Sequence, residues 1–329
     1  MRIFSGIQPS GELHIGNYVG AISQWVDLQV GNDAIYCIVD QHAITVRQDP
    51  KALRTKIRSV AALYIAAGVN PSKSHIFIQS ENPDHAYLTW MLNCVTPYGQ
   101  LLRMTQFKEK SDKQRENTTV GLFDYPVLMA SDILLYKTDE VPVGDDQVQH
   151  IELTRDLAEK FNSFYGEVFK LPKVRLVESK TRIMSLQDPG SKMSKSDENV
   201  RATIFLLDDT DTVVEKIKRA VTDSGNEIVY REDKPAVSNL LSIYSTVSSE
   251  SIEELEKKYR GVGYGQFKEE LAQAVIEFLI PLQEKYREIY ADNQTLDRVL
   301  DEGAEYTQDI SGKTLSEARE AMGLGRALR

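Results

Sequence analysis

The first residues able to do chemistry are His14 and Asn17, which stand three positions apart at the start of a predicted helix. Just before them, a short apolar run ends and the backbone is interrupted by Gly6, Pro9 and Gly11. Beyond them, apolar residues recur at helical spacing. A strand, a glycine-rich turn and a helix N-terminus together predict a phosphate site, because unpaired backbone N–H groups there point at a bound anion. On this pattern alone, His14 and Asn17 could equally well cap the helix.

A second candidate region holds Lys192 and Lys195 in the run D-P-G-S-K-M-S-K-S-D at residues 188–197. Lysine is a point charge that suits a mobile phosphate. A solvated loop is the simpler interpretation of such a run. The turn near residue 14 carries neither the P-loop motif G-x-x-x-x-G-K-[ST] nor the dinucleotide motif G-x-G-x-x-G. A phosphate-handling function therefore rests on the two regions taken together.

The pair H-I-G-N at residues 14–17 and K-M-S-K-S at residues 192–196 resembles the two signatures of class I aminoacyl-tRNA synthetases. Asn17 stands where the general class I signature has a second histidine, a departure within the range of the family. Further short sequence segments make the chain similar to the tryptophanyl-tRNA synthetase family from residue 3 to residue 326. These segments are F-S-G-I-Q-P-S-G, C-I-V-D-Q-H-A-I-T, R-M-T-Q-F-K-E-K, D-I-L-L-Y, V-P-V-G-D-D-Q-V-Q-H-I-E-L-T-R-D and A-M-G-L-G-R.

The resemblance implies a ligase that activates L-tryptophan with ATP to tryptophanyl-AMP and transfers it to tRNA(Trp). Mg²⁺ would arrive with ATP, and no dedicated protein metal site is expected. The resemblance also implies a homodimer. Two alternatives stay open on the sequence: a tyrosyl-tRNA synthetase, and a nucleotidyltransferase that shares the H-I-G-x turn.

The same resemblance implies three groups of site residues. The catalytic group is His14, Asn17, Lys110, Lys192 and Lys195. The ATP-binding group is Gln8, Pro9, Ser10, Gly16, Asn17, Gly144, Asp145, Asp146, Ile183, Lys192, Met193, Ser194, Lys195 and Ser196. The tryptophan-binding group is Phe4, Tyr125, Met129, Asp132, Val141, Val143 and Gln147.

One acid in the last group stands out in the sequence itself. Tyr125, Met129 and Asp132 share one face of a predicted helix over residues 121–136. An acid on an apolar stripe is costly unless it has a partner, so a buried salt bridge is one interpretation. The resemblance implies the other, in which Asp132 accepts the indole N–H of tryptophan. A tyrosine pocket would instead need both a donor and an acceptor at the phenol.

The elements expected to position these residues form an α/β protein. Apolar runs at residues 33–39, 75–79 and 141–144 alternate with helical patterns such as residues 52–67, which predicts a doubly wound, Rossmann-like parallel sheet. Ligands bind at the carboxyl ends of strands in such sheets. A last strand at residues 182–184 is expected to lead into the lysine loop.

After residue 197 the pattern becomes helical, apart from a candidate strand at residues 202–206. Helices are expected at residues 210–221, 236–247, 251–259, 266–290, 296–304 and 315–322. We therefore expect a catalytic domain over residues 1–190, with a helical insertion at about 80–120. Residues 191–329 would form the K-M-S-K-S loop and an α-helical anticodon-binding domain, whose terminal helices can return to the catalytic domain.

Composition narrows the class of protein further. The chain has 329 residues and a formal net charge of −10, which argues against indiscriminate nucleic-acid binding, although residues 103–115 form a local basic run. It has two cysteines, no C-x-x-C motif and no apolar run of 18 residues, so a cytoplasmic protein without a membrane span is expected. The apolar segment at residues 86–104 predicts a dimer interface.

Overall fold

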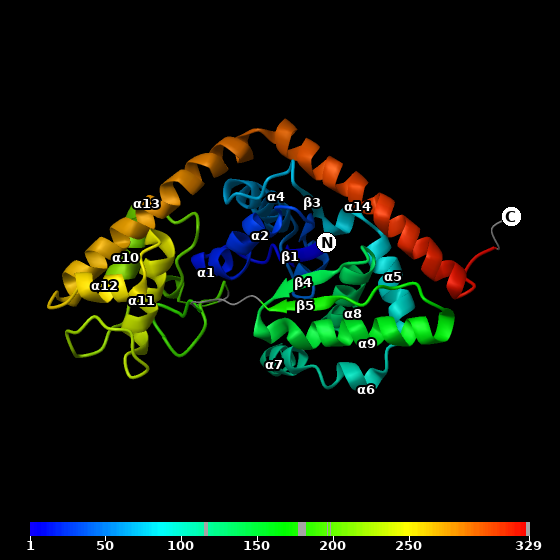
Figure 1. Ribbon diagram of the computed structural model, residues 1–329, viewed down its shortest axis with the longest axis horizontal. Helices are drawn as coiled ribbons and strands as arrows, with labels where there is room; N and C mark the ends of the chain where they lie inside the picture. The colour runs from blue at the N-terminus through cyan, green and yellow to red at the C-terminus, as the bar shows by residue number, and fades with distance from the viewer. Residues whose placement is uncertain (115–117, 177–181, 196, 198, 327–329) are drawn as a thin grey trace.

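The computed structural model describes residues 1–114, 118–176, 182–195, 197 and 199–326. At its centre lies a parallel sheet in the order β3-β2-β1-β4-β5 (Figure 1). The strands are β1 (Arg2–Ile7), β2 (Asp33–Ile38), β3 (Ser74–Ile78), β4 (Glu140–Val143) and β5 (Lys173–Leu176). The chain first winds outward from β1 to β3 and then returns to the other side of β1. The doubly wound α/β prediction is confirmed, and the winding reverses between β1 and β4.

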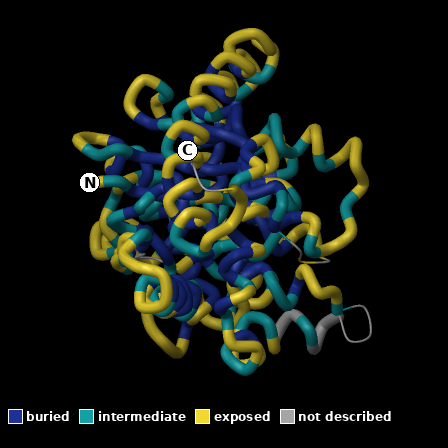
Figure 2. The backbone as a smooth tube through the Cα atoms, turned by 90° about the vertical axis from the view of Figure 1, so that its right-hand side faces the viewer, coloured by how far each residue is buried: buried dark blue, intermediate teal, exposed yellow. Residues whose placement is uncertain are grey.

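Both faces of the sheet are buried, as the alternation along β2 shows. Ala34, Tyr36 and Ile38 belong to one cluster of buried apolar side chains, and Ile35 and Cys37 belong to another. Successive side chains of a strand point to opposite faces, so a strand covered on both sides must be apolar throughout. This is why β2 appears in the sequence as a continuous apolar run. Figure 2 shows these buried segments inside an exposed outer layer.

Helices cover the two faces and extend below the sheet. Before β4 they are α1 (Ile15–Asn17), a π-helical turn (Tyr18–Ile22), α2 (Ser23–Leu28), α3 (Asp40–Ala43), α4 (Pro50–Ala66), the 3₁₀ turn Gln79–Glu81, α5 (Asp84–Asn93), α6 (Tyr98–Leu101), α7 (Thr105–Gln114) and α8 (Val120–Leu134). The 3₁₀ turn Asp145–Gln147 and α9 (Val148–Tyr165) follow β4. Helices α5 to α7 fall within the region expected as an insertion.

The bounds of α4 follow from local chemistry. The side chain of Asp49 accepts a hydrogen bond from the backbone N–H of Ala52, which caps the first turn. Pro50 occupies a position in that turn where no donor is needed. The helix gives way at Gly68, whose φ of 111° is accessible mainly to glycine. The helix predicted at residues 52–67 is thus confirmed with a slightly earlier start.

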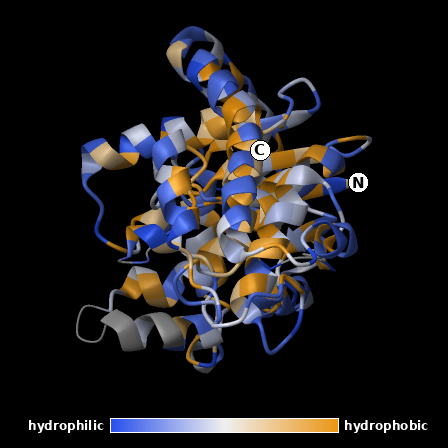
Figure 3. Cartoon of the chain, turned by 90° about the vertical axis from the view of Figure 1, so that its left-hand side faces the viewer, coloured by the Kyte–Doolittle hydropathy of each residue, from blue (hydrophilic) through white to orange (hydrophobic). Residues whose placement is uncertain are grey.

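The C-terminal part is helical, as expected. It contains the 3₁₀ turn Val200–Ala202, α10 (Thr210–Lys218), α11 (Pro235–Ser248), α12 (Ile252–Lys258), α13 (Tyr264–Ala291) and α14 (Asn293–Ala321). Helices α13 and α14 form an inverted V above the sheet, with α10 to α12 under one arm and the strands under the other (Figure 1). One apolar cluster continues from the sheet face into α10–α13. Hydrophilic and hydrophobic residues both occur along these helices (Figure 3).

Three expected elements were wrong. Residues 182–184 are not a sheet strand, because Met184 makes only an isolated bridge to Lys192, and the fifth strand is β5. β5 was missed because K-V-R-L at a sheet edge is charged and mostly exposed, as edge strands often are. Residues 202–206 form no sheet strand either; Phe205 makes an isolated bridge to His14.

The third correction concerns the end of the chain, where two predicted helices are one 29-residue helix, α14. Small buried residues, Gly303, Thr307 and Ser311, replace the apolar stripe in its middle. A Cβ at Gly303 would collide with the backbone carbonyl of Ile76, so the helix packs directly against edge strand β3. In the described part of the chain, no helix is long and apolar enough to span a membrane.

Candidate active site

Two adjoining cavities lie at the carboxyl ends of β1 and β4, where the winding of the sheet reverses. We call them the inner cavity, of about 330 Å³, and the outer cavity, of about 700 Å³. The two cavities share four of their lining residues, Gln8, Gly20, Ala21 and Gln147. Doubly wound sheets bind ligands at this position. The geometry therefore offers two adjacent subsites whose occupants would meet near these four residues.

The inner cavity brings together every residue predicted to bind tryptophan. Its lining includes Phe4, Tyr125, Met129, Asp132, Val141, Val143 and Gln147. Two polar residues outside the predicted tryptophan-binding group, His42 and Gln106, also line it. His42 follows β2 directly, so its position after a strand was a usable signal. Gln106 accepts a hydrogen bond from the Tyr125 hydroxyl at 3.3 Å, a contact between α7 and α8 that no sequence spacing reveals.

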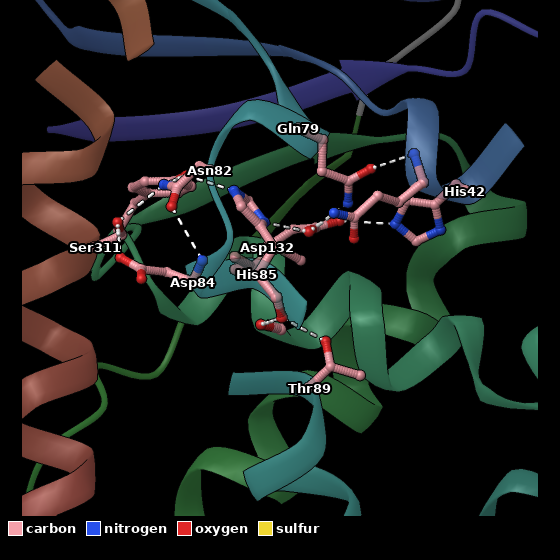
Figure 4. Close-up of polar contacts among 12 residues, drawn as sticks. His42, Gln79, Asn82, Asp84, His85, Thr89, Asp132 and Ser311 are labelled. Atoms are coloured by element: carbon pink, nitrogen blue, oxygen red, sulfur yellow. Dashed lines mark hydrogen bonds and ion pairs between the residues drawn. The ribbon is translucent and has the colours of Figure 1, made fainter. Parts of the chain in front are cut away.

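Asp132 has three side-chain donors around its carboxylate (Figure 4). His42 Nε2 lies 2.7 Å from Oδ2. Oδ1 is approached by His85 Nδ1 at 2.6 Å and by Gln79 Nε2 at 2.7 Å. Each carboxylate oxygen can accept about two hydrogen bonds, so the oxygen nearer His42 retains capacity for one further donor. The buried salt-bridge interpretation and the ligand interpretation of this acid are thus compatible.

Asp132 is 1% exposed, and burial alone would raise the pKa of its carboxyl group. The attraction of His42 and the hydrogen bonds from His42 and His85 outweigh burial and lower the pKa of Asp132 well below its usual range. The acid is therefore ionised at neutral pH. A fixed carboxylate in an apolar cavity strongly favours a ligand with an N–H group at that depth.

The outer cavity collects most of the residues predicted to bind ATP. Those that line it are Gln8, Ser10, Gly16, Asn17, Asp146, Lys192, Met193, Ser194 and Lys195, together with His14. Gly144 lines the inner cavity instead. Pro9, Asp145 and Ile183 line neither, and Ile183 is buried beside Gly16. Ser196 and the side chain of Lys110 lie outside the described part of the chain.

The turn at residues 14–17 caps the helix that follows and also presents N–H groups that can donate hydrogen bonds. Asn17 Oδ1 accepts the backbone N–H of His14 at 3.1 Å, so the capping interpretation is correct for Asn17 and leaves its amide N–H₂ available. His14 is 4% exposed, and its Nδ1 is a buried atom without a hydrogen-bond partner. A Cβ at Gly16 would lie 3.0 Å from that ring, so glycine makes room for the imidazole. The turn presents nitrogen groups suited to a phosphate.

Charge in the outer cavity is tuned by burial. Burial, and then the nearby Lys195 and Lys192, lower the pKa of His14 to about 3, so this imidazole is neutral at physiological pH. Burial, and then Lys56, lower the pKa of Lys195 to about 8. The Lys195 ammonium donates to the backbone carbonyl of Gln8 at 3.1 Å. The lysine thus connects the lysine loop to the end of β1, and an anion between them would restore its full charge.

Backbone pairing holds the two motifs together. Ile15 donates to the carbonyl of Ile204 at 3.0 Å, and Leu206 donates to that of Leu13 at 2.8 Å. On the other side of the lysine loop, the Asn239 side chain bonds both backbone groups of Met184, at 2.8 and 2.9 Å. The loop is therefore anchored at both ends, at one to the glycine-rich turn and at the other to α11.

This sheet order, with a histidine–asparagine turn after β1 and a two-lysine loop facing it, defines the catalytic domain of a class I aminoacyl-tRNA synthetase. Residues 1–280 match the model of the family "tRNA synthetases class I (W and Y)". The chain is 54% identical over 328 residues to the tryptophan--tRNA ligase of Halalkalibacterium halodurans, with 99% of each chain covered. The chain belongs to the tryptophanyl-tRNA synthetase family.

Solved structures agree with this assignment. The tryptophanyl-tRNA synthetase of Mycoplasma pneumoniae superimposes with a TM-score of 0.89 at 35% identity, covering 98% of both chains. The enzyme of Campylobacter jejuni, solved in complex with ADP and tryptophan, gives a TM-score of 0.86 at 37% identity, covering 98% of this chain and 100% of that one.

Proposed function

We propose that the protein activates L-tryptophan with ATP and transfers the tryptophanyl group to tRNA(Trp). The observation that carries this proposal is the pair of adjoining cavities, one apolar with a buried carboxylate and one lined by phosphate-binding groups. A related enzyme has been solved with ADP and tryptophan. The inner cavity would hold the indole, with its N–H directed at Asp132. The outer cavity would hold the nucleotide.

The chemistry needs positioning more than proton transfer. The tryptophan carboxylate attacks the α-phosphorus of ATP, the bond to the bridging oxygen breaks, and pyrophosphate leaves with that electron pair. A ribose hydroxyl at the end of the tRNA then attacks the acyl carbon, and AMP leaves. Neutral His14 and the amide of Asn17 donate to phosphate oxygens, while Lys192 and Lys195 stabilise charge on the departing pyrophosphate.

Mg²⁺ enters this proposal as part of the nucleotide substrate. Within the described residues, no group of three or more His, Cys, Asp or Glu side chains is arranged to hold a metal ion. Mg²⁺ is commonly bound through substrate phosphates and water. For the tRNA, we assign the acceptor end to the mouth of the outer cavity and the anticodon stem to helices α10–α13. We place the enzyme in the cytoplasm, where protein synthesis consumes charged tRNA.

We further propose that two copies of the chain pair through α5 and α6. Trp90 on α5 is 70% exposed and Tyr98 on α6 is 69% exposed. Tyr87 and Leu102 add further exposed apolar surface on the same segment. Large aromatic side chains at this level of exposure are typical of interface residues. Sedimentation should show a dimer that Trp90→Glu dissociates and Val30→Glu, at an exposed site after α2, leaves intact.

The central test is exchange of labelled pyrophosphate into ATP, measured with each of the twenty amino acids. Tryptophan should support exchange, and tyrosine should support far less, because a phenol needs a donor as well as an acceptor and the three donors at Asp132 already bond its carboxylate. Exchange that prefers tyrosine would contradict the proposal. Exchange that needs no amino acid would favour the nucleotidyltransferase alternative.

A further inference from the structure

A chain of buried hydrogen bonds leads from the inner cavity to the C-terminal helix (Figure 4). His85 Nε2 lies 2.6 Å from the Tyr136 hydroxyl. Asn82 donates from Nδ2 to that hydroxyl at 3.2 Å and to the Ser311 hydroxyl at 2.9 Å. We call this chain the α14 relay; its members, from the cavity outward, are Asp132, His85, Tyr136, Asn82 and Ser311. Every member is buried, and the last lies 179 positions along the chain from the first.

The direction of each hydrogen bond in the α14 relay is determined. Asn82 Oδ1 accepts the backbone N–H of Asp84 at 3.1 Å, so its Nδ2 must face Tyr136. Since the Tyr136 oxygen already accepts there, its own proton goes to His85 Nε2. Burial raises the pKa of Tyr136, so the phenol keeps that proton. His85 then carries its ring proton on Nδ1, the tautomer that donates to the carboxylate.

The far end of the relay is fixed in the same way. Ser311 accepts from Asn82, and its own hydroxyl donates to Asp84 Oδ2 at 2.6 Å. The backbone carbonyl of His85 accepts two further hydroxyls, from Thr89 at 2.7 Å and from Ser131 at 2.8 Å. His85 can therefore neither rotate nor change tautomer without leaving a buried polar atom unsatisfied, which is costly.

We propose that the α14 relay is a positioning device for Asp132, so that the seating of α14 against β3 contributes to tryptophan affinity. The inference rests on the proposed function for the identity of the substrate, tryptophan. The relay itself follows from the hydrogen bonds alone. Ser311 touches neither cavity, so any effect on tryptophan must pass through the relay. Helix α14 follows α13 directly along the chain, and α13 packs on α10 and α11. The relay thus gives the helical part of the chain a contact with the amino-acid subsite.

The chain offers a matched pair of substitutions on α14. Ser311→Ala removes the outer end of the relay. Thr307→Val, one turn earlier on the same buried face, removes a hydroxyl that bonds only carbonyls of its own helix, Gly303 and Ala304. Tyr136→Phe removes the middle of the relay while keeping the ring that stacks on Phe4. All three should be made in the full chain.

Pyrophosphate exchange supplies the first readout. Tyr136→Phe should raise the KM for tryptophan about tenfold and Ser311→Ala about threefold, as expected for losing one buried hydrogen bond. The kcat and the KM for ATP should stay within about twofold. Thr307→Val should leave all three constants unchanged. Equal effects of Ser311→Ala and Thr307→Val on the KM for tryptophan would show that Ser311 contributes only to packing, and would overturn the proposal.

The second readout does not depend on catalysis. The chain has five histidines, so ¹⁵N imidazole signals can be assigned with single His→Gln variants. His85 should show protonated Nδ1 and unprotonated, hydrogen-bonded Nε2. Both Tyr136→Phe and Ser311→Ala should shift the Nε2 signal, whereas Thr307→Val should not. An unchanged Nε2 signal in Ser311→Ala would overturn the relay even with a fully active enzyme, while absence of tryptophan-dependent exchange in the unmodified protein would overturn the proposed function alone.

Discussion

The inner and outer cavities adjoin, yet they are built in opposite ways. In the inner cavity the critical acid, Asp132, has three protein donors before any ligand arrives. In the outer cavity His14 Nδ1 has no hydrogen-bond partner among the residues that the structure describes, and Lys192 is exposed on a loop. On the proposed function, selection of the amino acid would therefore rely on groups already fixed by the fold, whereas stabilisation of phosphate charge would be completed by the substrate itself.

The strongest test of this contrast is Lys195→Ala. On the proposed function, the lysine stabilises charge that grows on the leaving pyrophosphate, so the rate of adenylate formation should fall about 100-fold or more. Tryptophan binding should change little, because Lys195 does not line the inner cavity. Rapid-quench measurement of tryptophanyl-AMP checks this, with Lys73→Ala at an exposed turn as the control. An unchanged rate would show that Lys195 takes no part in adenylate formation.

The inner cavity is tested by Asp132→Ala. Removing the carboxylate leaves the indole N–H and the donors of His42, Gln79 and His85 without their acceptor, at a cost of about 1–3 kcal/mol for each group left unpaired. Preference for tryptophan over phenylalanine in kcat/KM should shrink about 10- to 100-fold. Asp132→Asn, which keeps one acceptor oxygen, should reduce this preference less. Exchange assays with both amino acids provide the measurement, and equal losses for the two substrates would make Asp132 purely structural.

A smaller effect is expected from Gly16→Ala. The added methyl would lie 3.0 Å from the His14 ring and would push it from its place in the outer cavity. We expect the KM for ATP to rise about tenfold, as for one lost charge-assisted hydrogen bond, with an unchanged KM for tryptophan. Gly265→Ala, where a Cβ meets open space, is the control. A rise in the tryptophan KM instead would show that the two cavities are not independent.

The smallest effect concerns pH. Because the pKa of Lys195 is lowered to about 8, the lysine is charged below that pH and neutral above it. The kcat/KM for ATP, which reports the free enzyme, should therefore be constant near pH 7 and fall about tenfold per pH unit well above pH 8. His14, with a pKa of about 3, should add no inflection between pH 5 and 8. A profile that is flat to pH 10 would show that Lys195 is not the titrating cation.

Helix α14 shows where sequence patterning was insufficient. Its two ends carry apolar residues and were predicted as separate helices, but its middle relies on Gly303, Thr307 and Ser311. Glycine is a poor helix former in isolation, and serine and threonine are weaker helix formers than alanine. Here they allow close packing on β3, and that packing stabilises the helix they would otherwise weaken. Spacing of small residues at every fourth position was the available signal.

The surroundings of Asp132 teach a related lesson. The acid itself could be singled out, because a charge on an apolar helix face requires a partner. Its donors come from three separate places, namely His42 after β2, Gln79 after β3 and His85 on α5. Their approach depends on strand order and on the docking of α5 against α8, neither of which is encoded in local spacing.

The residues that line the two cavities were implied by the resemblance to a known family. The sequence by itself determined the alternation of strands and helices, and the glycine-rich turn and distant lysine loop as candidates for binding phosphate. These follow from local rules: apolar periodicity, glycine punctuation and residue chemistry within a few positions. Only the tertiary structure decided that residues 173–176 form the edge strand, that α14 is one helix seated on β3, and that Asp132 is held by two histidines and a glutamine. Those features depend on contacts between segments far apart in the chain, where neighbouring residues carry no information about the partner.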